Sequence, residues 1–347
     1  MTTGKPYILT SDVSGTLSEW INRLSPSSIS LIDDVHTHTH CLPLLQEAIP
    51  SFKEITLKPG EQQKNLTGAS FIWEKLTENK TDRKGLVIVL GGGVLGDMGG
   101  FCAATFKRGI SFILIPTTLL AQVDASVGGK LAIDFQHYKN HIGVFQEPVC
   151  TIIDTAFLKT LPESELRSGF AEIIKHCLIA DQKMWLDISK KNLKEQDWNK
   201  LVAHSVEIKN RITTEDPKES GLRKILNFGH TVGHAIESAA LIKDQPLLHG
   251  EAIAAGMICE SFIACRKGLI SEIELKSVST YIRSIYTPIP ISSSSEELLT
   301  LMAQDKKNNA NKILMSLPSG LGSCRWDIET SPEEIISSLE FYSQVHP

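Results

Sequence analysis

The sequence predicts an α/β domain with a mainly parallel sheet, followed by an all-α domain. In the first half, short runs rich in β-branched residues alternate with helical segments, a pattern typical of a parallel sheet covered by helices. The strand-like runs are residues 29–32, 86–90, 112–115 and 149–153. After Asp154, in residues 166–212 and 229–268, apolar side chains recur mostly at steps of three and four. That spacing predicts helices for the second half.

Two domains are expected from the length of the chain, 347 residues, because a single hydrophobic core rarely organises so many. We place them at residues 1–161 and 162–347, since Pro162 and the acidic residues on either side of Ser164 start a helix well. An active site between two domains is the usual arrangement. Residues 289–295, with Pro290 and four consecutive serines, predict a loop before a final helical stretch.

Composition and charge exclude several classes of function. With 41% hydrophobic and 22% charged residues, the chain is typical of a folded globular protein. A net charge of -5 and a pI near 6.1 give no field that attracts nucleic acid, so no nucleic-acid partner is expected. The sequence has no signal-peptide pattern and no run of roughly 18 apolar residues that could span a membrane. The seven cysteines form no C-x-x-C pair, which favours buried thiols, a cytoplasmic location and no membrane partner.

A glycine-rich turn follows the buried strand at residues 86–90. Gly91, Gly93 and Gly96 satisfy the pattern G-x-G-x-x-G between a strand and a helix-like segment, where backbone N–H groups could bind a pyrophosphate. The acidic residue expected about 20 positions later is absent, so a standard Rossmann ribose contact is not predicted. The alternative is a turn that serves only close packing.

Three histidines lie within twenty residues in the second half. His230 and His234 share a helix face because they are four positions apart, and His249 would reach them from the next element. Imidazole and carboxylate groups are the ligands that catalytic zinc prefers. A single such histidine is more often a surface or satisfied core residue, but three together, flanked by glycines, favour a metal site.

Several motifs occur together and in a characteristic order. They are Gly93-Val94-Leu95-Gly96-Asp97, Lys107-Arg108-Gly109, residues 116–124, Ser126-Val127-Gly128-Gly129-Lys130, Lys139-Asn140, Ala171-Glu172-Ile173-Ile174-Lys175, Gly221-Leu222-Arg223, residues 227–237 and His249-Gly250-Glu251-Ala252. This series resembles the 3-dehydroquinate synthase family of the sugar phosphate cyclase superfamily. The resemblance extends from about Pro59 to Lys307. It implies an N-terminal Rossmann-like domain that binds NAD and a helical C-terminal domain that binds a divalent metal, zinc or else cobalt.

The resemblance also implies roles for individual residues. The implied metal ligands are Glu172, His230 and His249. The implied NAD-binding residues are Asp34, Glu61, Lys64, Gly92, Gly93, Val94, Asp97, Thr117, Thr118, Leu120, Asp124, Lys130, Lys139, Phe157 and Thr160. The implied catalytic and substrate-binding residues are Arg108, Asp124, Lys130, Asn140, Lys175, Lys209, Arg223, Asn227, His234 and Lys306.

The activity that the resemblance implies is a phosphate-eliminating cyclisation. The family converts 3-deoxy-D-arabino-heptulosonate 7-phosphate to 3-dehydroquinate and phosphate in the shikimate pathway of aromatic amino-acid biosynthesis. NAD oxidises the substrate transiently, phosphate is eliminated, the hydride returns, and an intramolecular aldol step closes the ring. The family also implies a homodimer.

Three alternatives remain open at this stage. Another sugar phosphate cyclase, forming 2-deoxy-scyllo-inosose, a valiolone-type ring or an amino-dehydroquinate, would use the same metal and NAD. A metal-dependent polyol dehydrogenase would release NADH stoichiometrically. A catalytically inactive binding module would need neither the ligand set nor the polar side chains around it. The polar side chains that favour a substrate with a carboxylate are Arg108, Asn140, Lys175, Lys209 and Arg223.

Two segments depart from the family pattern. His36, His38 and His40 lie at steps of two, so on a strand they would share a face and could mimic a metal site. We expect a solvated turn or strand end, because they have no carboxylate in the register of the family. Residues 131–138 differ from the family in what we expect to be a loop beside Lys130. His176 stands where relatives commonly carry an aromatic residue, so it is left out of the site.

Overall fold

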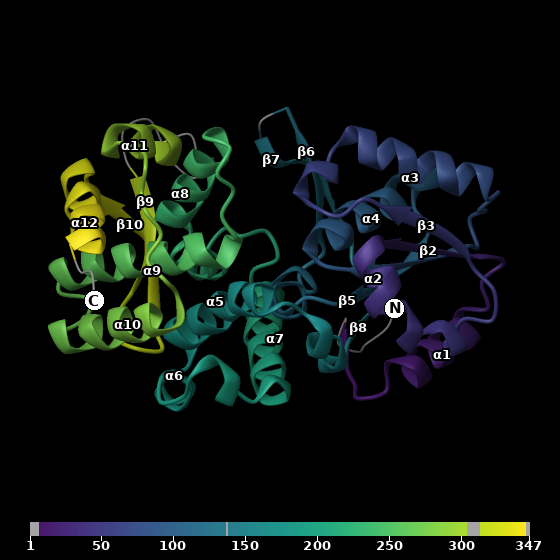
Figure 1. The fold of residues 1–347 in the computed structure, drawn as a ribbon, viewed down its shortest axis with the longest axis horizontal. Helices are drawn as coiled ribbons and strands as arrows, with labels where there is room; N and C mark the ends of the chain where they lie inside the picture. Colours follow the sequence, from purple (N-terminus) through teal and green to yellow (C-terminus); the bar gives the residue numbers. More distant parts are fainter. Residues whose placement is uncertain (1–6, 137, 304–312, 345–347) are drawn as a thin grey trace. The chain divides into compact units, whose positions relative to one another are not determined.

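The computed structural model describes residues 7–136, 138–303 and 313–344 (Figure 1). The chain forms two compact units, Met1–Leu166 and Arg167–Pro347. The division falls inside helix α5 (Glu163–Ala180), a short way beyond the boundary that the sequence predicts at residues 161 and 162.

The N-terminal unit is built on a six-stranded sheet in the order β1-β8-β5-β4-β2-β3. Every neighbouring pair is parallel, which confirms the predicted parallel sheet. The strands are β1 (Tyr7–Leu9), β2 (Ile29–Asp34), β3 (Lys53–Leu57), β4 (Leu86–Gly91), β5 (Ser111–Pro116) and β8 (Cys150–Ile153). The four predicted runs became β2, β4, β5 and β8. The two edge strands were missed, because β1 has only three residues and β3 is largely exposed.

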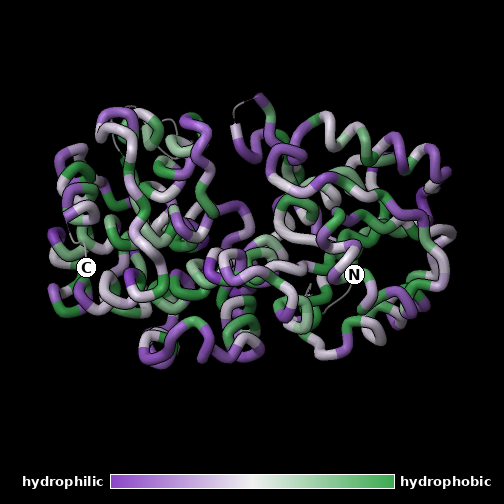
Figure 2. Tube along the Cα trace, viewed as in Figure 1, coloured by the Kyte–Doolittle hydropathy of each residue, from purple (hydrophilic) through white to green (hydrophobic). Residues whose placement is uncertain are grey.

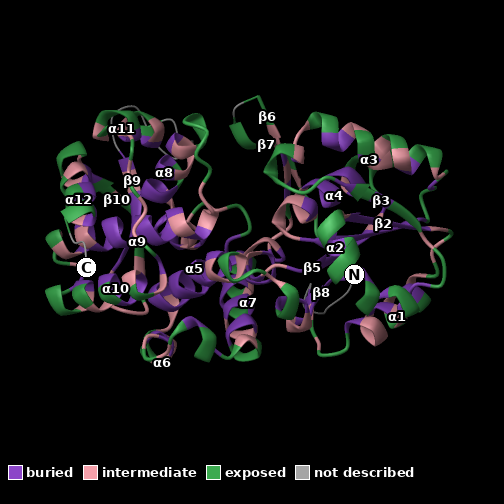
Figure 3. Ribbon diagram, viewed as in Figure 1, coloured by how far each residue is buried: buried purple, intermediate pink, exposed green. Residues whose placement is uncertain are grey.

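Helices cover both faces of this sheet. Alternate side chains of β4 point to opposite faces, so Ile88 lies in one apolar cluster with Leu17 of α1, while Val89 lies in another with Ile72 of α3 and Met98 of α4. The helices are α1 (Val13–Leu24), α3 (Leu66–Glu78) and α4 (Gly93–Thr105). Figure 3 shows the inner strands as buried, and Figure 2 shows hydrophilic and hydrophobic residues alternating along α3. Each fully buried aliphatic side chain contributes about 1.5–3 kcal/mol.

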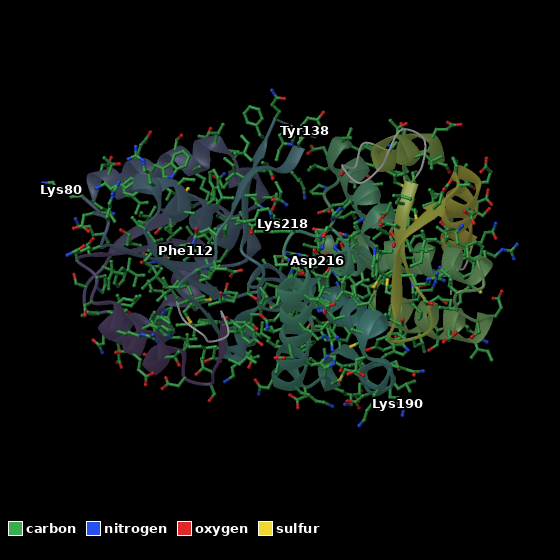
Figure 4. All side chains as sticks on the ribbon, turned by 180° about the vertical axis from the view of Figure 1, so that it is seen from behind. Lys80, Phe112, Tyr138, Lys190, Asp216 and Lys218 are labelled. Atoms are coloured by element: carbon green, nitrogen blue, oxygen red, sulfur yellow. The ribbon has the colours of Figure 1, made fainter. Side chains whose placement is uncertain are left out.

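Two segments of this unit differ from the sequence expectation. The tract predicted as a loop forms an antiparallel hairpin, β6 (Lys130–Phe135) and β7 (Tyr138–Phe145). Its alternating apolar residues explain this, because Leu131 and Ile133 are buried in the core beside α4 while Tyr138 is exposed near the tip (Figure 4).

The histidine-rich tract is a short helix, α2 (Val35–His40), so the expectation of a turn or strand end was wrong. Oδ1 of Asp34 accepts hydrogen bonds from the backbone N–H groups of His36 and Thr37 at 2.9 Å each. The hydroxyl of Thr37 in turn accepts from the Asp34 N–H at 2.9 Å. This reciprocal capping box starts a helix where the spacing of the histidines suggests a strand.

The C-terminal unit is mostly helical, as predicted. Its helices are α5, α6 (Gln182–Ile188), α7 (Trp198–Glu215), α8 (His230–Ile242), α9 (His249–Arg266), α10 (Glu272–Ile285), α11 (Ser295–Ala303) and α12 (Pro332–Gln344). The sequence did not reveal an antiparallel pair in the same unit, β9 (Ile313–Pro318) and β10 (Cys324–Thr330). Helix α9 is buried along most of its length and packs against α8, α10, α12 and β9, as expected for a helix that is apolar on most sides.

Short helical turns complete the fold. They are η1 (Leu42–Leu44), η2 (Gln46–Ala48), η3 (Glu61–Gln63), η4 (Phe106–Arg108), η5 (Ala121–Ala125), η6 (Thr155–Thr160), η7 (Leu193–Glu195) and η8 (Leu222–Asn227). Within the described residues, no helix has the combination of length and apolar character that a membrane span requires.

Candidate active site

Three side chains from three helices of the C-terminal unit converge on one point. Glu172 comes from α5, and His230 and His249 are the first residues of α8 and α9. Nε2 of each histidine lies 3.5 Å from Oε1 of Glu172, and one potential ligand atom from each residue lies within 4.8 Å of the other two. The chain therefore brings one carboxylate and two imidazoles together from positions that are far apart in sequence. We call this set the triad.

The charge state of the triad follows from its surroundings. Glu172 is fully buried; burial opposes its ionisation, but Lys175 and His249 outweigh burial and hold the pKa of this carboxyl well below its usual range. Burial, followed by the charge of Lys175, lowers the pKa of His230 well below the usual value. Nδ1 of His230 donates to the carbonyl of Phe228 at 3.1 Å, which leaves the Nε2 lone pair directed at Glu172.

His249 lies between two carboxylates. Its Nε2 faces Glu172 at 3.5 Å, and its Nδ1 lies 3.6 Å from Oε2 of Glu237 on α8. Burial lowers the pKa of His249, but the two carboxylates outweigh burial and raise it to about 9. A carboxylate on the far side of a ligating imidazole fixes its tautomer and orientation.

Close backbone packing sets the position of His249. The N–H of Gly250 donates to the hydroxyl of Ser168 on α5 at 3.0 Å. A Cβ at Gly250 would lie only 2.0 Å from the carbonyl oxygen of Ser168. Only glycine allows α9 to start this close to α5, one turn before Glu172.

A buried carboxylate sets the position of His230. Gly229 precedes α8 with φ of 80° and offers no capping side chain. Glu260 of α9, which is fully buried, accepts hydrogen bonds from the N–H groups of Gly229 at 2.6 Å and Val232 at 3.0 Å. An anion at a helix N-terminus is stabilised by the helix dipole and by the N–H groups that lack a partner inside the helix. Glu260 thus caps α8 from the neighbouring helix.

Other predicted residues of this unit take different positions. Lys175 lies against Oε2 of Glu172, and the ring of His234 lies 4.9 Å from that of His230, centroid to centroid. Lys209 is buried on α7. Lys306 lies outside the described residues. His176, which was left out of the predicted site, is buried with its Nδ1 against the hydroxyl of Ser205.

Arg223 and Asn227 belong to η8, whose start is organised by Asp216, a residue labelled in Figure 4. Oδ2 of Asp216 accepts from the N–H groups of Gly221 at 2.7 Å and Arg223 at 3.1 Å. These bonds lower the pKa of Asp216 to about 2, and the bond from Gly221 has the largest effect. The side-chain amide of Asn227 donates to Glu219 at 2.7 Å.

The N-terminal unit contains a pocket at the glycine-rich turn. It is lined by Val89, residues 91–93, Gly96, residues 114–116, Ala121, Ala125 and Ser126. Gly92 caps α4 without a side-chain hydrogen bond, and a Cβ at Gly96 would meet nothing within 4 Å. The first turn of α4, which includes Val94, is therefore open to a ligand, as a pyrophosphate site requires.

A buried lysine links several predicted residues beside this turn. Nζ of Lys64 donates to Oδ2 of Asp97 and to Oδ1 of Asn140, both at 2.6 Å. Burial raises the pKa of Asp97, and the ammonium of Lys64 opposes this effect. Asn140 has φ of 51°, an unusual conformation that its bonds to Lys64 and Asp134 hold in place. Nearby, Nζ of Lys139 lies 3.8 Å from Oε1 of Glu61.

The remaining predicted residues of the N-terminal unit lie on several elements. Thr117 and Thr118 follow β5, where the N–H of Thr117 donates to the carbonyl of Gly91 at 3.0 Å. Leu120 directly precedes η5, and Asp124 lies within η5. Lys130 is the first residue of β6, and Thr160 is the last residue of η6. The side chain of Phe157 is buried in the core, so only its backbone could face a cofactor. Arg108 has φ of 69° and is followed by Gly109 at 106°, a strained conformation of the kind found at binding sites.

The sequence reasoning missed three residues that support the triad: Ser168, Glu237 and Glu260. Glu237 could have been found, because it is three residues beyond His234 on the same helix. Glu260 also gave a signal, since an isolated carboxylate in the apolar segment 252–264 must have a buried partner. Nothing in the sequence pairs Ser168 with Gly250, because their contact depends on how α5 and α9 pack.

The fold occurs in solved structures of NAD- and metal-containing cyclases. One is the 2-epi-5-epi-valiolone synthase of Streptomyces hygroscopicus subsp. jinggangensis 5008, with NAD+ and Zn2+ bound; its TM-score is 0.88 at 24% identity, over 99% of this chain and 98% of that one. Another is a 2-deoxy-scyllo-inosose synthase with carbaglucose-6-phosphate, NAD+ and Co2+, with a TM-score of 0.86 at 23% identity, over 96% of each chain. At these identities the likeness concerns the fold.

Sequence similarity defines the family more narrowly. The family models described as 3-dehydroquinate synthase N-terminal and C-terminal match residues 54–168 and 169–308. The 3-dehydroquinate synthase of Parabacteroides distasonis is 38% identical over 344 residues, which cover 97% of each chain. The chain belongs to the 3-dehydroquinate synthase family and is therefore an enzyme.

Proposed function

We propose that this chain is a 3-dehydroquinate synthase, which converts 3-deoxy-D-arabino-heptulosonate 7-phosphate to 3-dehydroquinate and phosphate. The reaction is a step of the shikimate pathway and makes the chain a cyclising carbon–oxygen lyase. Family membership and full-length similarity to the Parabacteroides synthase support the proposal. The structural observation that carries it is the convergence of Glu172, His230 and His249 in the C-terminal unit.

The triad fits a divalent metal, Zn2+ or alternatively Co2+. Within the described residues, neither oxygen of Glu172 accepts a hydrogen bond of ordinary geometry, although the carboxylate is fully buried. Two imidazole nitrogens face one of these oxygens, and one carboxylate with two imidazoles is a donor set that leaves a position open for substrate. When bound, the metal supplies Lewis-acid polarisation of a substrate hydroxyl. Glu237 would hold His249 in the orientation that this role requires.

The pocket at the glycine-rich turn fits the pyrophosphate of NAD. The uncapped N–H groups of α4 and the open space at Gly96 supply its contacts. When bound, NAD supplies a hydride acceptor that later returns the hydride, so the reaction has no net redox change. Lys64 would keep Asp97 and Asn140 in fixed positions beside this pocket.

Cations of the chain match a substrate with a carboxylate and a phosphate. Lys175, Lys209 and Arg223 are each less than a tenth exposed, and buried cations are stabilised by anions. The guanidinium of Arg223 offers a fork for a carboxylate or phosphate, and the lysines offer point charges. The family resemblance assigns Arg108 and Lys130 to substrate binding as well.

The proton transfers of the reaction need few protein side chains, because the substrate itself carries a base. We assign removal of the proton at C6 to an oxygen of the departing phosphate, which is itself a base. His234 is exposed beside His230 and His249, and an imidazole can move a proton near neutral pH. We assign His234 to hydrogen bonding or proton transfer on the substrate side.

The test is incubation of the purified enzyme with the heptulosonate phosphate, NAD and Zn2+, while phosphate and absorbance at 340 nm are followed. The proposal requires phosphate release without net NADH. Accumulating NADH would point to a dehydrogenase, and absence of phosphate release with metal restored would refute the proposal. The family resemblance also supports a homodimer, and size-exclusion chromatography with light scattering would check this.

A further inference from the structure

Helix α2 brings one of its histidines to a pair of carboxylates on the sheet. Nδ1 of His38 lies 3.5 Å from Oδ2 of Asp33, the residue before the last of β2, and it contacts Oε1 of Glu54 on β3. The parallel register pairs Leu31 with Glu54 and Asp33 with Thr56, so the two acidic residues lie on adjacent strands. The potential ligand atoms of these three residues lie within 4.8 Å of one another. The proposed reaction uses none of the three.

Asp33 is in an unfavourable environment for a carboxylate. Its side chain is 0% exposed, and neither of its oxygens accepts a hydrogen bond of ordinary geometry within the described part of the chain. The charged groups that act on it are Glu54 and His38. Burial, reinforced by Glu54, raises the pKa of Asp33 to about 7, although the hydroxyl of Thr56 and the charge of His38 oppose this effect. A buried carboxylate with so few partners must bind a proton or a cation.

The neighbouring groups supply the rest of a cation site. The side chain of Glu54 is 32% exposed and that of His38 is 50% exposed, so an ion can enter from solvent. Ligands about 2.0–2.2 Å from zinc lie about 3.3–3.6 Å from one another in a tetrahedral site. The 3.5 Å separation of His38 and Asp33 already matches that spacing.

Charge also matches a dication. Two carboxylates and a neutral imidazole carry two negative charges, and like charges this close repel one another unless a proton or metal lies between them. We propose that Asp33, His38 and Glu54 bind a divalent transition-metal cation of the zinc type. This site lies in the N-terminal unit, separate from the triad in the C-terminal unit, and it does not depend on the proposed function.

A cation there would join three elements of the N-terminal unit. It would tie β2, β3 and α2 together and fix Asp34, whose side chain caps α2 directly after Asp33. Because the ligands come from different segments, the ion binds the folded chain more tightly than the unfolded chain, and it should raise the unfolding temperature.

The test titrates the metal-stripped full chain with Zn2+ alone and measures both calorimetric stoichiometry and unfolding temperature. The variants are Glu54→Gln and His38→Gln, and His40→Gln is the matched control, because this exposed histidine lies on the same helix. His249→Ala removes a triad ligand and leaves the N-terminal cluster intact.

The proposal predicts that His249→Ala still binds one Zn2+ per chain and that adding Glu54→Gln or His38→Gln to it abolishes that binding. In the same background His40→Gln should retain binding. Asp33→Asn should also lose binding, and circular dichroism checks that each variant is folded. If His249→Ala binds no Zn2+, or if the Glu54 and His38 variants bind as the His40 control does, the proposal is wrong. Failure here leaves the cyclase reaction untouched, since that is measured separately by phosphate release.

Discussion

Replacing Gly250 with alanine should separate α9 from α5 and weaken the triad. The new Cβ would lie 2.0 Å from the carbonyl oxygen of Ser168 and 2.5 Å from its Cα. Non-bonded carbon and oxygen atoms need about 3.4 Å, so the two backbones must move apart by about 1.4 Å. Overpacking of this kind destabilises a fold by about 1–3 kcal/mol.

The same displacement acts directly on the metal ligands. Gly250 is adjacent to His249, and Ser168 is one helical turn before Glu172, so the 3.5 Å separation of Nε2 and Oε1 should lengthen by a similar amount. A ligand displaced by about 1 Å lies outside the range that zinc tolerates. We therefore expect Zn2+ affinity to fall by about 10- to 100-fold, as for loss of an orienting partner.

Urea unfolding of the metal-free protein measures the first effect, and competition with a chromophoric chelator measures the second. Gly96→Ala is the control, because a Cβ at this helical position of α4 would meet nothing within 4 Å. It should bind Zn2+ at the triad as the wild type does. If Gly250→Ala retained both the stability and the triad affinity of the wild type, the packing account of His249 would be refuted.

Three further predictions concern individual carboxylates and ligands. Glu172→Ala and His249→Ala should each abolish binding of Zn2+ at the triad, measured in the Glu54→Gln background, which removes the proposed second site. If either variant still binds one Zn2+ per chain, the ligand set is wrong. Glu260→Gln should destabilise the protein by about 2 kcal/mol in urea unfolding, because an amide nitrogen would face an N–H donor in place of a charge-assisted bond. It should also weaken triad affinity, and an unchanged affinity would show that capping of α8 does not position its first residue. The raised pKa of Asp33, about 7 against a usual 3.8, is a stabilising contribution present below pH 4 and lost as the pH rises to 7. The unfolding temperature of metal-free Asp33→Asn should therefore rise relative to that of the wild type as the pH is increased from 4 to 8. A difference between the two proteins that stays constant over this range would contradict the assignment.

Much of the parallel sheet could be predicted from the sequence, because its inner strands are buried on both faces. Residues 86–90 form an uninterrupted apolar run, which few other structures accommodate. The hairpin β9 and β10 was missed because its strands are separated by an ordinary Gly-containing turn that also suits a loop between helices. In α2, the capping box of Asp34 and Thr37 determined the structure, and the two-residue repeat of histidines was misleading.

Only part of the candidate site could be predicted from the local spacing of residues in the sequence. His230 and His249 stand out because imidazoles and glycines cluster near them, whereas Glu172 was assigned through the family resemblance alone. Its proximity to them depends on how α5, α8 and α9 pack, which no local spacing encodes. The cluster of Asp33 and Glu54 was inaccessible for a similar reason, since it depends on the register of β2 and β3.

The most direct test of the central claim is identification of the product by NMR after incubation with the heptulosonate phosphate, catalytic NAD and Zn2+. Parallel reactions with sugar phosphates that lack a carboxylate, such as glucose 6-phosphate, provide the comparison. We expect one equivalent of 3-dehydroquinate per phosphate released, with no cyclic product from the other substrates. Cyclisation of a carboxylate-free sugar phosphate, with none of the heptulosonate, would contradict the claim and place the enzyme with another cyclase activity.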